Sequence, residues 1–298
     1  MNRGIICAVI ILAAVCTAYP QPELQPLLSA SDSFARASEA KGMKRAFLEF
    51  LSDDAVIFRS SAQNGKQFWL SQPDESDEIL SRNTTFADIS SNGMLGYTTG
   101  NWRLFPKGKS ESGAKFGQYV TIWEKRGDGR FYATLDITIM HDKLPFLVTD
   151  KAVPAVGKRD PNKRGWSPAD ASMNFLRASM TGSGLAGAYE RFAADEVRLL
   201  IEGQPPFIGK KRVVEVMKGY QSIEFPKKAT MFQATDMAYV WNPCRYANSD
   251  EGVESGNCLH IWKLRDKKWW IVLGVFAPVV DSTEPVLKPR SRTKRSGD

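Results

Sequence analysis

The sequence predicts an α+β protein built from two tandem cone-shaped domains, each a curved antiparallel sheet wrapped around a long N-terminal helix. The first observation is an internal repeat, since residues 117–137 and 256–275 both consist of a strand-like run, a short polar turn and a second strand-like run. The turn residue Asp128 of the first run matches Asp266 of the second. The second observation is the order of the patterns, since apolar residues at helical spacing precede the strand-like runs in each copy. The third is length, because 298 residues fit two domains of roughly 100–200 residues each.

Residues 1–18 have the features of a secretory signal peptide. Arg3 precedes an apolar run over residues 5–15, which is shorter than the roughly 20 residues of a membrane span. A basic start, a short apolar run and a small residue at the cleavage point are typical of such leaders. We expect cleavage after Ala18 and a secreted or periplasmic protein. Cys16 leaves a lipoprotein open as one alternative, and a buried N-terminal helix is the other.

The net charge of +7 is concentrated at the C-terminal end and does not indicate nucleic-acid binding. Residues 280–298 are rich in Lys and Arg and too polar to fold, so we interpret them as a basic disordered tail. We expect no nucleic-acid partner and no membrane span. His141 and His260 show no ligand spacing, so neither a metal nor a cofactor is predicted.

Two cysteines, Cys244 and Cys258, remain once the leader is removed. Export permits a disulfide. The two residues flank the hairpin-like segment 245–257, so they can face each other on neighbouring strands. We therefore predict one disulfide between them, with two free thiols as the alternative.

The first copy begins with helical spacing and continues with strands. Residues 19–30, rich in Pro and Gln, are interpreted as a linker, and a helix capped by Ser31 or Asp32 is expected to start near Phe34. Gly42 interrupts the helical pattern and predicts two helices or a kink. A strand over 55–58 and a short helix over 68–70 follow, then strands over 84–89, 94–102, 117–125 and 131–139.

The last strand of the first copy alternates with a period of two. Its apolar positions share one face: Phe131, Ala133, Leu135, Ile137 and Ile139. Its other face is mixed: Tyr132, Thr134, Asp136 and Thr138. Because successive side chains of a strand point to opposite faces, we expect one continuous apolar face and one mixed face. The periodicity separates the two faces but does not say which of them looks into the cone.

The second copy repeats this order after a linker. Residues 143–167 contain several prolines and basic residues and are interpreted as the interdomain linker. Residues 181–184 interrupt the opening helix of the second copy, as a glycine does in the first. We assign the two domains to residues 31–142 and 168–279.

Four phrases occur in order in the first copy and more loosely in the second. They are AFLEFLSDDAV at 46–56, LGYTTGNW at 95–102, GQYVTIW at 117–123, and DGRF at 128–131 leading into LDI. In this order they resemble the nuclear transport factor 2-like superfamily, of SnoaL-like or ketosteroid-isomerase-like type. The resemblance implies a cystatin-like cone with a pocket between helix and sheet. It implies no single activity, since some members are isomerases, dehydratases or cyclases and others bind a small molecule or only assemble.

Asp136 is the candidate catalytic residue. The family often has an acid at this place in the last strand, pointing into the pocket, where a carboxyl group can act as general acid or base. The alternative is an aspartate that hydrogen-bonds to a Tyr, Trp or Arg for structure only. The second copy has Gly274 at the matching position and therefore lacks this acid.

Aromatic residues on the expected strands are candidates for lining the pocket. They are Tyr97, Trp102, Tyr119, Trp123 and Tyr132. Their rings provide apolar contact and their polar tips can orient a ligand, and ordinary core packing is the alternative for each. Arg59, which follows the strand at 55–58, is a candidate partner for Asp136 or for an anionic ligand, with a solvated surface position as the alternative.

We therefore expect a secreted protein that binds a small apolar or aromatic molecule in its first cone. One alternative is an isomerase, dehydratase or cyclase that uses Asp136 for proton transfer, and another is a structural scaffold of two cones. Residues 269–276 are apolar on both faces, and two apolar faces need two partners. We expect the two copies to pack as an internal pseudo-dimer and the chain to be monomeric.

Overall fold

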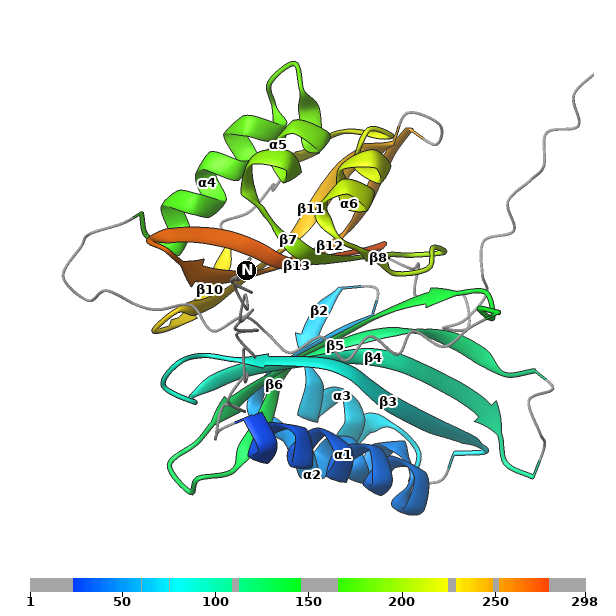
Figure 1. The fold of residues 1–298 in the computed structure, drawn as a ribbon. Helices are drawn as coiled ribbons and strands as arrows, with labels where there is room; N and C mark the ends of the chain where they lie inside the picture. Colours follow the sequence, from blue (N-terminus) through cyan, green and yellow to red (C-terminus); the bar gives the residue numbers. More distant parts are fainter. Residues whose placement is uncertain are drawn as a thin grey trace, which may run out of the picture.

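The computed structural model describes most of the chain between residues 24 and 278 as two halves, each a curled sheet with helices on one face (Figure 1). The residues within this range that it does not describe are 60, 75, 109–112, 146–165, 225–228 and 249–251. The expected signal peptide, most of the expected interdomain linker and the expected basic tail lie outside the described residues. None of the helices in the described ranges combines the length and the apolar character that a membrane span requires.

The two halves contain the same order of elements. In the first half these are α1 (Leu24–Lys41), α2 (Met43–Phe50), β1 (Leu51–Phe58), β2 (Ala62–Asn64), α3 (Gly65–Ser71), β3 (Glu78–Ile89), β4 (Leu95–Pro106), β5 (Lys115–Lys125) and β6 (Phe131–His141). In the second half they are α4 (Pro168–Ser179), α5 (Gly184–Phe192), β7 (Ala193–Ile201), β8 (Phe207–Ile208), α6 (Lys210–Met217), β9 (Tyr220–Glu224), β10 (Thr230–Ala234), β11 (Met237–Asn248), β12 (Gly252–Arg265) and β13 (Lys268–Pro278).

Helix α1 begins earlier than the sequence predicts. Its first residue is Leu24, so residues 24–30, expected to belong to a linker, are helical, and Leu27 is fully buried. The proline in its first turn is compatible with a helix, because the first N–H groups of a helix have no intrahelical partner. Gly42 separates α1 from α2, which confirms the expected interruption. Its φ of 86° lies in a region that favours glycine.

The two sheets share one topology. The strand order is β2-β1-β6-β5-β4-β3 in the first sheet and β10-β11-β12-β13-β7-β8 in the second, where β9 also pairs with β11. The long strands that follow one another in the chain pair antiparallel. Strand β1 nevertheless runs parallel to β6, and β7 runs parallel to β13. Each sheet is therefore mainly antiparallel, as the sequence predicted, with one parallel pair that the sequence did not predict.

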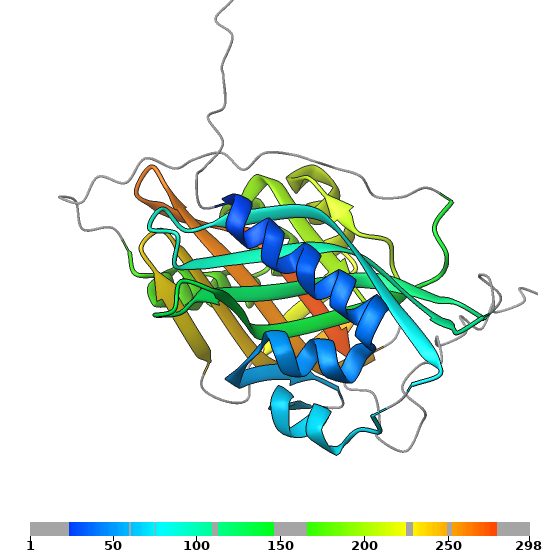
Figure 2. The ribbon, with the colours of Figure 1, turned by 90° about the horizontal axis from the view of Figure 1, so that it is seen from below.

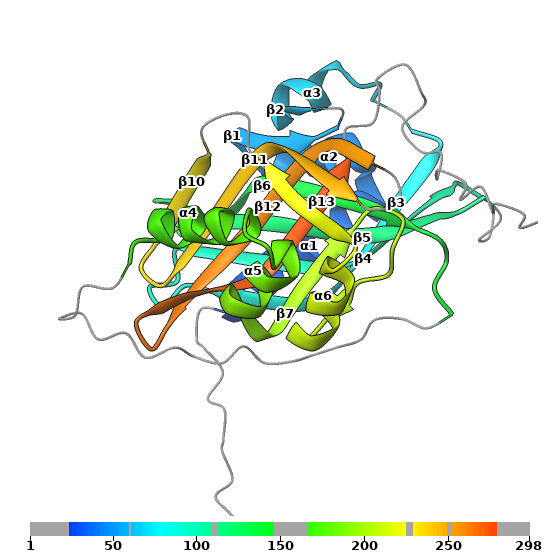
Figure 3. The ribbon, with the colours of Figure 1, turned by 90° about the horizontal axis from the view of Figure 1, so that it is seen from above.

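The sheets pack against each other face to face, and the helices lie on the outer sides of this pair (Figures 1 and 3). Helices α1 and α2 cover the first sheet on its free face (Figure 2). The buried cluster between the sheets draws on both halves and includes Leu95, Tyr97, Val120, Ile122, Leu135, Ile137, Leu200, Tyr239, Leu259, Ile261, Leu273 and Val275. The predicted packing of the two copies through their sheets is therefore present.

A buried lysine joins the two halves. Lys263 of β12 donates from Nζ to the carbonyl oxygen of Ile89 at 2.5 Å and to Oδ1 of Asp88 at 3.2 Å, both on β3. Oδ2 of Asp236 lies 3.6 Å from the same Nζ, and its Oδ1 accepts from the backbone N–H of Ser91 at 2.6 Å. Burial raises the pKa of Asp88, and the Lys263 charge opposes this rise.

The predicted disulfide is confirmed. Cys244 on β11 and Cys258 on β12 are bonded, with their Cα atoms 5.8 Å apart. Their strands are neighbours in the second sheet, as the flanked hairpin-like segment indicated.

Candidate ligand pocket of the first half

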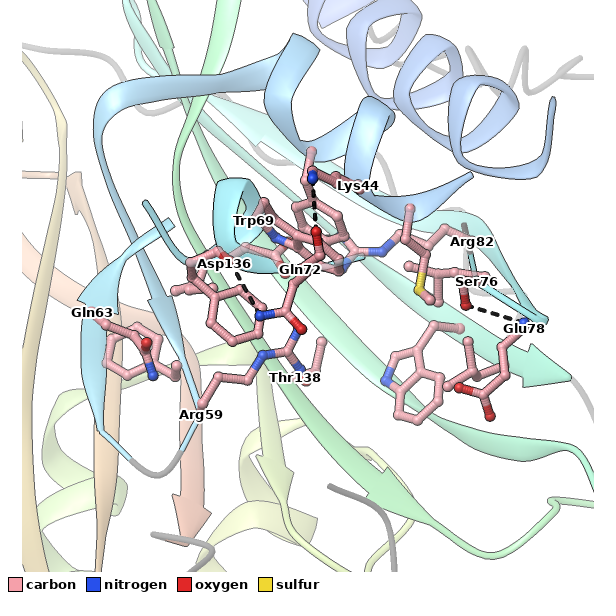
Figure 4. A pocket seen from close by; sticks show the side chains of 18 of the residues that line it. Lys44, Arg59, Gln63, Trp69, Gln72, Ser76, Glu78, Arg82, Asp136 and Thr138 are labelled. Atoms are coloured by element: carbon pink, nitrogen blue, oxygen red, sulfur yellow. Dashed lines mark hydrogen bonds and ion pairs between the residues drawn. The ribbon is translucent and has the colours of Figure 1, made fainter. Parts of the chain in front are cut away.

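A pocket of about 580 Å³ opens between the helices and the sheet of the first half, beside the second half (Figure 4). Its apolar lining consists of Met43, Phe47, Ile57, Phe58, Phe68, Trp69, Leu80, Trp102, Leu104 and Met140. Its polar lining includes Lys44, Arg59, Gln63, Gln72, Glu78, Arg82, Asp136 and Thr138. The second half completes it with Glu202, Asn257, Ala277 and Pro278.

A bulge in strand β6 decides which side chains reach this pocket. The pairing of β5 with β6 shifts at Trp123, which stands opposite Ala133. Ala133 packs in the core of the first half, whereas Leu135 packs against the second sheet. One inserted residue reverses the alternation of side chains. The prediction of a continuous apolar face is therefore wrong. Asp136 lies on the pocket side of the sheet, as expected. Tyr132 lies on the opposite side of the sheet.

Asp136 is held by Arg82 of β3 in an ion pair with two hydrogen bonds. Nη1 of Arg82 donates to Oδ2 of Asp136 at 2.7 Å, and Nη2 donates to Oδ1 at 2.9 Å. The Thr121 hydroxyl donates to Oδ2 at 2.7 Å. The two charged side chains are only 3% and 7% exposed. Both carboxylate oxygens thus already accept short, charge-assisted hydrogen bonds.

Aromatic rings surround the guanidinium group of Arg82. Its central carbon lies 4.9 Å from the ring centre of Phe34, 5.4 Å from that of Phe47 and 4.6 Å from that of Tyr119. Burial lowers the pKa of Arg82, but the charge of Asp136, the hydrogen bonds between Asp136 and Arg82, and Tyr119 together outweigh this effect, and the net shift of the pKa is upward. The pair is therefore a fixed charge pair at the base of the pocket.

Arg59 extends from the end of β1 into the pocket (Figure 4). Its guanidinium carbon lies 4.9 Å from the ring centre of Phe68 and 5.7 Å from that of Trp69. Burial lowers the pKa of Arg59, while the charge of Asp136 raises it and that of Arg82 lowers it further. Within the described part of the chain, Arg59 forms no ion pair, because its candidate partner Asp136 is engaged by Arg82.

Lys44 and Glu202 are two of the other ionisable groups among the lining residues. Lys44 donates from Nζ to Oδ1 of Asp74 at 2.6 Å and to the carbonyl oxygen of Gln72 at 2.7 Å. Glu202, which follows β7 in the second half, accepts from the backbone N–H of Met140 at 2.9 Å. Burial raises the pKa of Glu202 to about 7, although this hydrogen bond acts in the opposite direction. Glu202 therefore titrates near neutral pH.

The structure distributes the aromatic candidates over different places. Trp102 lines the pocket. Tyr119 and Trp123 pack in the core of the first half, outside the pocket lining. Tyr97 lies between the two sheets. Tyr132 is half-buried near the β5–β6 turn, where its hydroxyl hydrogen-bonds to an aspartate. Of the five aromatic candidates, Trp102 alone lines this pocket.

The second half has a different arrangement at the matching place. His260 pairs with Gly274 in the second sheet as Thr121 pairs with Asp136 in the first. A Cβ atom at Gly274 would lie 2.8 Å from the hydroxyl oxygen of Tyr189, which is hydrogen-bonded to Nε2 of His260 at 2.9 Å. Burial lowers the pKa of His260 to about 3. A neutral Tyr–His pair thus occupies the place of the carboxylate.

Part of the chain is similar in fold to known structures. No family model and no curated protein matches the chain. An NTF-2-like protein of unknown function from Shewanella oneidensis is 14% identical, with 39% of this chain and 97% of that chain covered at a TM-score of 0.32. A ketosteroid isomerase-like protein from Erwinia carotovora atroseptica is 16% identical, with 38% and 94% covered at 0.31. A protein of unknown function with a cystatin-like fold from Nostoc punctiforme is 13% identical, with 40% and 92% covered at 0.31.

These neighbours are nuclear transport factor 2-like, ketosteroid isomerase-like and cystatin-like proteins. Each of them corresponds to less than half of this chain. The similarity concerns the fold.

Sequence reasoning missed Arg82, Lys44 and Glu202 as lining residues. Arg82 lies on β3, which begins at Glu78 and not near residue 84 as predicted. A longer strand would have placed Arg82 on one face with Leu80, by the period of two. Glu202 belongs to the other half, so no local pattern indicates it. Within the described ranges, no group of three or more His, Cys, Asp or Glu side chains is arranged to hold a metal ion.

Proposed function

We propose that this protein binds a small apolar or aromatic molecule in the cone of its first half. The observation that carries the proposal is the pocket of about 580 Å³, which lies within the range of small-molecule sites, roughly 300–1,000 Å³. Its lining is mainly aromatic and aliphatic, with a few polar groups at defined places. Burial of apolar ligand surface in such a cavity provides the main driving force for binding.

The state of Asp136 favours binding over proton transfer. A general base needs a lone pair within hydrogen-bond reach of the substrate. The oxygens of Asp136 accept two bonds from Arg82 and one from Thr121, which occupy three of the roughly four lone-pair sites of the carboxylate. This arrangement gives less support to an isomerase, dehydratase or cyclase that uses Asp136. A scaffold of two cones, the remaining alternative, leaves the pocket without a role.

Titration of the full chain with Nile red, an uncharged apolar dye, tests the proposal. We expect a saturable rise in fluorescence with one site per chain. Thr138 lines the pocket, so Thr138→Trp should fill part of the cavity and abolish the rise. Thr181 is exposed in the turn between α4 and α5, so Thr181→Trp is the matched control and should bind as the wild type does. Absence of saturable binding, or equal binding to both variants, would argue against the proposal.

We also propose that the protein is exported and that residues 1–18 are removed. The basic and apolar leader supports this, and so does the disulfide between Cys244 and Cys258, which is typical of oxidising compartments. N-terminal sequencing of exported protein should begin at Tyr19. A sequence that begins at Met1 would contradict the proposal.

A further inference from the structure

Three buried N–H donors in the pocket lining have no hydrogen-bond acceptor among the described residues. They are Nε of Arg59, Nε1 of Trp69 and Nε of Arg82. A buried polar group without a hydrogen-bond partner is destabilising. All three groups are donors, so this part of the lining has more hydrogen-bond donors than acceptors.

The charges of the lining leave one cation without a counter-ion. Lys44 is paired with Asp74, and Arg82 is paired with Asp136. Arg59 forms no ion pair with any of the residues that the structure describes. Its guanidinium group stays charged in proteins. A half-buried cation in a largely apolar lining is stabilised by an anion brought in with the ligand.

Two aromatic rings lie beside the guanidinium group of Arg59. The group packs over the rings of Phe68 and Trp69, at 4.9 and 5.7 Å from their centres. Packing on aromatic faces leaves the N–H edge of a planar guanidinium free for hydrogen bonds. That edge matches a carboxylate, which accepts two parallel N–H bonds.

We propose that the ligand is an amphipathic monocarboxylate, whose apolar body fills the cone and whose carboxylate pairs with Arg59. This inference rests on the proposed function and adds the chemical class of the ligand. Medium-chain fatty acids and aromatic carboxylic acids belong to this class. A ligand with a second negative charge is disfavoured, because the lining also carries the carboxyl groups of Asp74, Glu78 and Glu202.

Calorimetric titration of the full chain with decanoate and with decanol tests the inference. The two probes share one chain length and differ in charge. Arg59→Met removes the guanidinium group and keeps apolar volume, and Arg59→Lys keeps the charge but loses the planar fork. Arg45 is exposed on α2 outside the pocket lining, so Arg45→Met is the matched control.

We expect Arg59→Met to weaken decanoate binding at least tenfold and to leave decanol binding within twofold of the wild type. Arg59→Lys should bind decanoate with an affinity between those of the wild type and Arg59→Met. Arg45→Met should bind decanoate as tightly as the wild type. If Arg59→Met binds decanoate as tightly as the wild type while both bind decanol, the carboxylate inference is wrong and the proposed function stands. If the wild type binds neither probe nor Nile red, both fail. Should Arg59→Met not fold, equal binding of decanoate to the wild type and to Arg59→Lys would also overturn the inference.

Discussion

Arg82 and Asp136 meet across two intervening strands of the first sheet. Arg82 lies on β3 and Asp136 on β6, with β4 and β5 between them. Their side chains are nevertheless joined by hydrogen bonds of 2.7 and 2.9 Å. The length of the arginine side chain and the curl of the sheet make this contact possible. The pair thus links the edge strand β3 to strand β6.

We expect Asp136→Asn to destabilise the protein. The substitution leaves the Arg82 charge buried without a counter-ion, which costs about 3–5 kcal/mol. Urea unfolding followed by tryptophan fluorescence measures the change. Asp53 is 95% exposed in its pair with Lys66, so Asp53→Asn is a control that should cost less than about 1 kcal/mol. Equal stability of Asp136→Asn and the wild type would contradict a structural role for this pair.

Lys263→Met should weaken the contact between the two halves. It leaves Asp88 and Asp236 buried near each other without their shared cation, at a cost of about 3–5 kcal/mol. Lys267 is exposed at the β12–β13 turn, so Lys267→Met should change stability by less than about 0.5 kcal/mol. The midpoints of urea unfolding compare the two variants. If the two midpoints coincide, the cluster of Lys263, Asp88 and Asp236 does not stabilise the contact between the sheets.

Glu202 should make stability fall as the pH rises toward neutrality. Its pKa rises from 4.5 to about 7 in the folded protein. Between pH 4.5 and pH 7 the folded chain keeps a proton on Glu202 that the unfolded chain has released. The contribution of this proton to the free energy of unfolding is complete below pH 4.5 and is lost as the pH passes 7. The total loss is at most about 3 kcal/mol. Urea unfolding across this pH range should give a flatter profile for Glu202→Gln, and identical profiles would rule the effect out.

Replacing both Cys244 and Cys258 with Ala should cost about 2–4 kcal/mol. The disulfide joins two neighbouring strands and limits the freedom of the unfolded chain between them. The urea midpoints of the double variant and the wild type measure the loss. In the chain without residues 1–18, thiol titration of unfolded, unreduced protein should find no free thiol. Two thiols per chain would disprove the bond.

The chain should be monomeric in solution. Each sheet packs against its own helices on one face and against the other sheet on its opposite face. The apolar sheet faces are therefore already occupied within one chain. Light scattering coupled to size-exclusion chromatography is the measurement, and a stable dimer would contradict the expectation. Independent movement of the halves in small-angle X-ray scattering would also contradict the packing.

The order of elements was predictable because it depends on local patterns. Helical spacing, the interruption at Gly42 and the short helix before Pro73 all recur in the structure. The ends of elements were less predictable. Helix α1 includes residues interpreted as a linker, because Leu27 is buried by contacts with residues distant in sequence. Strand β3 starts at Glu78, in a polar stretch without a clear alternation.

The placement of site residues was only partly predictable. Three of the residues that the sequence offered as candidates, Asp136, Trp102 and Arg59, line the pocket. Tyr97 faces the second sheet, and Tyr132 lies near a turn. Strand alternation assigns residues to faces only as long as the pairing register continues, and the bulge in β6 ends that continuity.

The sequence by itself determined the two tandem copies, their α+β order and the cysteines that pair, because these depend on residue spacing along the chain. Only the tertiary structure decided which face of β6 looks into the cone, that Arg82 is the partner of Asp136, and that Glu202 of the second half completes the pocket of the first. The physical reason is that local backbone geometry sets periodicity, whereas facing and pairing depend on strand register and on packing between segments far apart in the chain.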